Sequence, residues 1–130
     1  MPTDPLWYEL RNAVYVREFE VANRLLHAAP HLLSMGNSLG ETVLHFLAVE
    51  NDIEGVTWMH SKGAAIDTKN EFGTPAIFEV AQLGYKELLE WFVQTGADVH
   101  IVDADGNGLA EYLNEYDEAD MREHVRRYGV

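Results

Sequence analysis

The strongest constraint on the fold of this 130-residue chain is an internal repeat with a period of 33 residues. Glycines, small residues and apolar residues recur at that interval in one register over most of the chain. A repeat of this length is typical of stacked supersecondary units, because one unit alone cannot bury its apolar face. The matching columns are Gly40/Gly73/Gly106, Asn37/Asn70/Asp103, Ala48/Ala81, Val56/Leu89, Met59/Phe92, Gly63/Gly96 and Ala64/Ala97.

Each unit follows the same local pattern. A turn containing the periodic glycine precedes a first helix, a polar break follows, and a second apolar helix ends at Gly-Ala. Glycine suits both the tight turn and the helix end, since both positions favour a positive φ. Thr74-Pro75 predicts a helix with Thr74 as its N-cap and Pro75 as its first residue, and Asp4-Pro5 predicts the same at the N-terminus.

The two central units resemble the ankyrin repeat family. Residues 40–48, Gly-Glu-Thr-Val-Leu-His-Phe-Leu-Ala, are close to the family pattern G-x-T-P-L-H-x-A-A, and residues 73–81 form a second copy. Gly63-Ala64-Ala65-Ile66-Asp67 and Gly96-Ala97-Asp98-Val99-His100 are similar to the family's closing G-A-D-V-N. The resemblance implies a single, mostly α-helical domain over residues 1–130, an ankyrin-repeat solenoid of stacked helix-turn-helix units with short β-hairpin fingers. The expected units are 4–36 as N-cap, 37–69, 70–102 and 103–130 as C-cap.

The apolar positions of the helices are interpreted as core and inter-repeat packing rather than as a cofactor site. The residues expected there are Val56, Trp58, Met59, Leu88, Leu89, Trp91, Phe92 and Val93.

The resemblance also implies a concave surface for partners, lined by the finger tips and the first helices. Leu39 and Phe72 are one period apart at the tips, where they either act as exposed anchors or fold onto the neighbouring finger. Acidic residues accompany them along the surface, with one base, Lys69. The predicted partner-binding residues are Leu39, Glu41, Glu50, Glu71, Phe72, Gln82, Asp105, Asn107, Glu115 and Tyr116.

The charge of the chain indicates the kind of partner. Its formal net charge is −13, which disfavours nucleic acid and anionic membranes and favours a basic protein. For a small acidic chain, the resemblance implies a neutralising role, such as an immunity protein that blocks a basic toxin. We expect a monomer when unbound. No apolar run approaches a membrane span and the N-terminus lacks a signal-peptide pattern, so we expect a cytoplasmic location.

Two other functions stay open. Asp103-Ala104-Asp105-Gly106-Asn107-Gly108 matches the start of an EF-hand calcium loop, and Asp103, Asp105 and Asn107 would supply its oxygen ligands. However, the twelfth position is Asn114, where a bidentate Glu is required. The chain could instead be the docking subunit of an enzyme complex.

The sequence offers no catalytic motif, so we predict a non-catalytic protein without a cofactor or metal ion. The chain has no cysteine, no nucleophile elbow and no phosphate-binding loop. His45 occupies the histidine position of the family motif, where we expect its imidazole to hydrogen-bond the backbone of a neighbouring loop. His27 and His31 have a helical ligand spacing, but Pro30 is expected to end the helix at residue 28 or 29.

Overall fold

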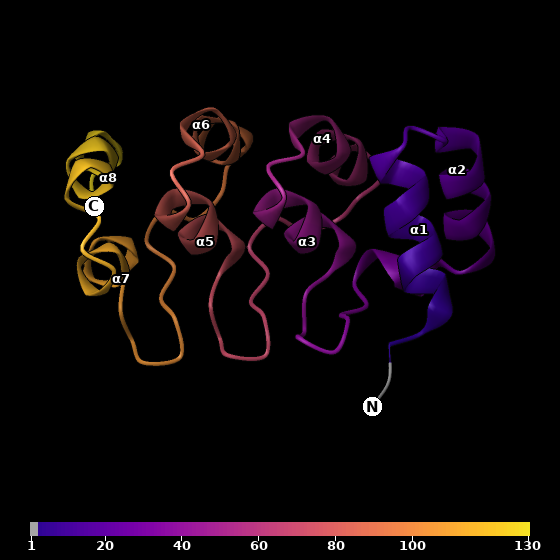
Figure 1. Ribbon diagram of the computed structural model, residues 1–130, viewed down its shortest axis with the longest axis horizontal. Coiled ribbons are helices and arrows are strands. Elements are labelled where there is room, and N and C mark those ends of the chain that lie inside the picture. Colours follow the sequence, from indigo (N-terminus) through magenta and orange to yellow (C-terminus); the bar gives the residue numbers. More distant parts are fainter. Residues whose placement is uncertain (1–2) are drawn as a thin grey trace.

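The computed structural model describes residues 3–130 and contains a row of helix pairs (Figure 1). The pairs are α1 (Pro5–Tyr15) with α2 (Phe19–Ala28), α3 (Val43–Val49) with α4 (Ile53–Ser61), α5 (Ala76–Gln82) with α6 (Lys86–Thr95), and α7 (Leu109–Glu115) with α8 (Ala119–Val125). Short 3-10 helices follow the first and last pairs, η1 (Pro30–Leu33) and η2 (Arg126–Tyr128). The prediction of a helical solenoid is confirmed, and α2 ends at Ala28, before Pro30, as expected.

Stacking of successive pairs produces one continuous core. The first helices α1, α3, α5 and α7 contact one another in order, and the second helices form a parallel row beside them (Figure 1). Of the predicted core residues, Val56, Met59, Leu88, Leu89 and Phe92 are buried. Trp58, Trp91 and Val93 are half-buried and pack against that core from the second helices. The core therefore lies between the two rows of helices and leaves the loops free to project.

The helix starts differ in one respect from prediction. The Asp4 carboxylate accepts a hydrogen bond from the Leu6 amide at 2.9 Å, and Pro5 begins α1 as expected. Thr74, in contrast, does not cap α5, because the N-cap is Pro75 and the helix begins at Ala76. Pro75 lies one period after Thr42, whose hydroxyl caps α3 by accepting from the His45 amide at 3.1 Å. The capping position is therefore one residue later than Thr-Pro suggested.

The projecting fingers are loops rather than β-hairpins. Within residues 3–130 the only β-type pairing is an isolated antiparallel bridge between Lys69 and Pro75. The two backbone bonds of this bridge run from the Asn70 amide to the Thr74 carbonyl and from the Ala76 amide to the Thr68 carbonyl, and α5 begins at Ala76, so no ladder follows. The part of the prediction that gave the fingers β-structure is not confirmed.

Side-chain hydrogen bonds shape each finger instead. The Oδ1 atom of Asn70 accepts from the Phe72 and Thr74 amides at 2.9 and 3.0 Å. Asn37 and Asp103 make the same pair of bonds in their own fingers. Adjacent fingers also bond directly, since the Glu71 amide donates to the Leu39 carbonyl at 2.8 Å. One polar residue per repeat thus closes the turn and presents the next residues at the tip.

Candidate protein-binding surface

The finger tips of the predicted surface carry exposed apolar side chains. Leu39 is 46% exposed and Phe72 is 66% exposed, and each directly follows a residue whose position is fixed by the finger turn. Asp105 occupies the same position in the next finger and is also exposed. The interpretation in which the tips fold away onto their neighbours is therefore wrong for both apolar residues. We call Leu39, Phe72 and Asp105 the tip row.

A second exposed row lies where the first helices end. Glu50, Leu83 and Tyr116 are the C-cap residues of α3, α5 and α7, and all three are exposed. The Tyr116 ring packs against the buried Tyr112 ring, with 4.9 Å between the ring centroids, so it is supported rather than free. We call these three residues the helix-end row. Each row advances by one repeat, so both run along the length of the solenoid.

Acidic residues in the two rows, and directly before row residues in the sequence, are exposed to solvent. Glu50, Glu71, Asp105 and Glu115 are exposed, and none makes an ion pair within residues 3–130. The negative charge of an exposed carboxylate attracts cations over about 8–10 Å at moderate ionic strength. The surface therefore combines apolar anchors with uncompensated negative charge.

Two predicted binding residues are less accessible than the tips. Gln82 is half-buried at the end of α5. Asn107 is half-buried as well, and its amide donates to the Glu115 carboxylate at 2.9 Å. That bond does not remove the negative charge of Glu115, but it fixes the orientation of the carboxylate.

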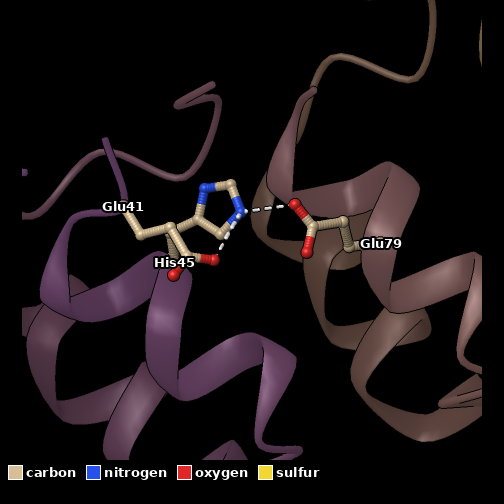
Figure 2. Close-up of side chains that lie close together, drawn as sticks. All are labelled: Glu41, His45 and Glu79. Carbon is tan, nitrogen blue, oxygen red and sulfur yellow. Dashed lines mark hydrogen bonds and ion pairs between the residues drawn. The ribbon is translucent and has the colours of Figure 1, made fainter. Parts of the chain in front are cut away.

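Glu41 does not lie on this surface, which corrects the prediction made for it. Its residue is 7% exposed, and its carboxylate turns toward His45 (Figure 2). The Nε2 atom of His45 lies 3.8 Å from Glu41 Oε2 and 3.0 Å from Glu79 Oε1. His45 was expected to bond a loop backbone, but α5 of the next repeat instead presents Glu79 to it, and among residues 3–130 His45 Nδ1 has no hydrogen-bond partner. We call Glu41, His45 and Glu79 the inter-repeat cluster.

The environment of Glu41 disfavours its charge. Burial raises the pKa of the Glu41 carboxyl above its ordinary value, and the nearby carboxylates of Glu79 and Glu50 raise it further. His45 and the Asn37 amide act in the opposite direction without cancelling the effect. The folded protein therefore binds a proton at this position more tightly than the unfolded chain does.

This shift predicts a pH dependence of stability. The pKa of Glu41 is higher in the folded protein than its ordinary value of 4.5. Ionising Glu41 therefore lowers the stability of the fold, and this loss is absent below pH 4.5 and complete above the raised pKa. We expect Glu41→Gln to remove that cost, so that its stability relative to the parent protein increases as pH rises from about 4 through that window. Urea denaturation at several pH values, in a buffer with EDTA, measures the difference.

The control is Glu71→Gln, which removes one negative charge from the exposed surface of a chain with a net charge of −13. If Glu41→Gln and Glu71→Gln change stability identically at every pH, the local environment of Glu41 is irrelevant and the interpretation is wrong.

The calcium-like motif has a structural explanation. Asp103 Oδ1 accepts from the Asp105 and Asn107 amides at 2.9 Å each, as Asn37 and Asn70 do at the equivalent positions. Gly106 has φ +80°, matching Gly40 and Gly73 at the same point of their turns. The pattern Asp-x-Asp-x-Asn-Gly therefore closes a third finger, whatever else its oxygens bind.

Sequence reasoning missed two features. Glu79 was not singled out, although a carboxylate inside a helix of mostly buried residues is a signal for a specific partner. The face of α1 was also overlooked, where the Arg11 guanidinium lies over the Tyr8 and Phe46 rings at 5.1 Å from each centroid. Tyr8 and Tyr15 are exposed on that helix and extend the aromatic surface to the N-terminal end of the solenoid.

The stacked helix pairs and the projecting fingers define a helical repeat protein. The family model described as ankyrin repeats (many copies) matches residues 44–93, and this match supports the assignment of the central repeats to the ankyrin repeat family. That match covers both central helix pairs, α3 with α4 and α5 with most of α6. Ankyrin repeats generally mediate protein–protein interaction. No helix within residues 3–130 has the length and apolar character required to traverse a bilayer.

Proposed function

We propose that this protein binds a basic protein through the tip row and its neighbouring acids, and that binding neutralises the partner without catalysis. The observation that carries the proposal is Phe72, the most exposed large apolar residue of the described part of the chain. It directly follows Glu71 and lies one finger before Asp105, and neither carboxylate makes an ion pair within residues 3–130. An apolar anchor surrounded by charge is the composition of an interface centre and its rim.

The proposal also depends on rigidity. Each finger is fixed by two side-chain bonds from one Asn or Asp and by packing on its neighbour. A surface that is already ordered loses little conformational entropy on association, which favours tight binding. The acids would accelerate the encounter with a basic partner and make it dependent on salt. A small monomeric domain of this kind blocks its partner by covering it.

The first experiment is capture of the partner from the native host with the tagged protein, washed at low and at high salt. We expect one basic protein, retained at low salt and weakened at high salt. Inhibition of that partner's own activity by the purified protein then separates neutralisation from docking. A captured enzyme whose activity is unchanged would support a docking subunit instead.

Charge reversal tests the surface once the partner is purified. We expect the double variant Glu71→Lys/Asp105→Lys to weaken binding by about 10–100-fold at low salt and to reduce the salt dependence. The matched control is Glu87→Lys/Asp120→Lys, which makes the same charge change at exposed positions on α6 and α8. Equal losses in the two variants would show that total charge, rather than this surface, controls binding.

The apolar anchor is tested separately with Phe72→Ala. Its expected effect is faster dissociation with an unchanged association rate, since short-range apolar contacts act after the encounter. Surface plasmon resonance measures both rates, and an unchanged dissociation rate would exclude Phe72 from the interface.

A further inference from the structure

The inter-repeat cluster brings three metal-ligating side chains together from two repeats. Glu41 and His45 come from the first central repeat, and Glu79 comes from α5 of the second. One ligand atom from each residue can be chosen so that all three lie within 4.8 Å of one another. Bonds of about 2.0–2.2 Å to a tetrahedral ion place ligand atoms roughly 3.3–3.5 Å apart. The separations of 3.0 and 3.8 Å from His45 Nε2 already bracket that spacing.

We propose that Glu41, His45 and Glu79 bind a divalent transition-metal ion, with Zn²⁺ as the best match. One imidazole and two carboxylates are a donor set that Zn²⁺ accepts, whereas Ca²⁺ and Mg²⁺ prefer oxygen ligands alone. Three protein ligands leave a fourth position of the tetrahedron for water or for a group from a partner. The proposal is independent of the proposed function, since it concerns the joint between two repeats.

The charge and burial of the cluster support an ion there. The His45 side chain is fully buried, and the Glu41 and Glu79 side chains are 10% and 18% exposed. In the forms that bind a metal ion, two carboxylates and an imidazole together carry a charge of −2, here with little contact to water. A buried charge requires a counter-charge, and a divalent cation supplies both positive charges at one point. Figure 2 shows both carboxylates approaching the same ring nitrogen, the atom that a metal would use.

Both carboxylates of the cluster are held by hydrogen bonds from neighbouring side chains, as metal ligands commonly are. The Asn70 amide donates to Glu79 Oε1 at 2.9 Å, and the Asn37 amide lies 3.5 Å from Glu41 Oε1. Outer hydrogen bonds of this kind orient carboxylate ligands and improve metal affinity. Asn37 and Asn70 are the same residues that close the fingers. Metal binding would therefore stiffen two adjacent fingers and the joint between their repeats together.

The test is a calorimetric titration of the EDTA-treated, dialysed protein with ZnCl₂, followed by thermal denaturation. We expect one ion per chain and, at about 100 times the Kd, a rise in Tm of roughly 5–10 °C. Co²⁺ in place of Zn²⁺ is expected to give the visible absorption bands of a tetrahedral site. CaCl₂ and MgCl₂ are expected to leave the Tm unchanged, and a response to CaCl₂ alone would overturn the assignment in favour of the Asp103 loop.

Matched variants locate the ion. Glu79→Gln and Glu41→Gln keep the side-chain shape and an oxygen acceptor, so both should fold, as circular dichroism will show. Each is expected to weaken Zn²⁺ binding by at least about tenfold. The control His100→Gln removes an exposed histidine outside the cluster and should bind like the parent protein. Absence of binding, or loss of affinity only in His100→Gln, would overturn the proposal and leave the cluster as an ion pair between repeats.

Discussion

Gly73→Ala is expected to lower the free energy of unfolding by about 2–4 kcal/mol. A Cβ atom at this position would lie 2.5 Å from the Cβ of Ala104 in the next finger. The residue also has φ +78°, which side-chain-bearing residues rarely adopt. The substitution therefore adds a steric clash between fingers to the local cost of the left-handed conformation. Chemical denaturation measures the loss.

Gly106→Ala is the matched control. Gly106 has φ +80° at the same point of its own turn, but an added Cβ meets nothing within 4 Å. We expect this variant to cost about 1–2 kcal/mol, the conformational part alone. The difference between the two variants isolates the contact between fingers. If they are equally destabilised, the fingers do not pack as described.

Asp52→Ala is expected to lower the free energy of unfolding by about 2–3 kcal/mol, because one buried carboxylate holds three groups. It accepts from both terminal nitrogens of the Arg17 guanidinium, at 2.6 and 2.9 Å, and caps α4 through the Gly55 amide at 3.2 Å. Arg17 follows α1, so the same side chain joins the N-terminal helix pair to the first central repeat. Loss of both roles should expose the first pair to unfolding.

Glu54→Ala separates the effect of burial from the effect of charge, because Glu54 and Asp52 both pair with Arg17. The Glu54 carboxylate lies 3.0 Å from Arg17 Nε, but its side chain is 66% exposed, against 6% for Asp52. Solvent screens an exposed pair, so we expect a loss of less than about 1 kcal/mol. Asp52→Asn should fall between the two, since the amide oxygen can still cap α4. Equal losses for Asp52→Ala and Glu54→Ala would contradict this account.

Fold class could be predicted because its determinants are local and repeated. Asn37, Asn70 and Asp103 close their turns with bonds to residues two and four positions later, and Gly40, Gly73 and Gly106 supply the positive φ there. Such bonds depend only on neighbouring residues, so a period of 33 is enough to place a finger before each of the helix pairs that begin with α3, α5 and α7. The exposure of Leu39 and Phe72 follows from the same local geometry.

The candidate site was only partly predictable, as Glu41 shows. It precedes α3 at an apparently exposed finger position, yet it is buried against His45 because Glu79 approaches from a helix 34 residues further on. The Thr-Pro pair was also misleading, since Pro75 is the N-cap of α5 and the helix starts at Ala76. Neither the burial of Glu41 nor the start of α5 follows from local sequence preferences, so the spacing of residues could not predict them.

The sequence by itself determined the repeat, the turn chemistry of the fingers, the order of the helices and the acidic character of the surface. Tertiary structure alone decided which carboxylates remain on that surface and which meet at His45. The physical reason is that a turn is fixed by bonds within a few residues. The partner of a buried polar group, in contrast, depends on how one helix packs against the next, and only the assembled solenoid sets that geometry.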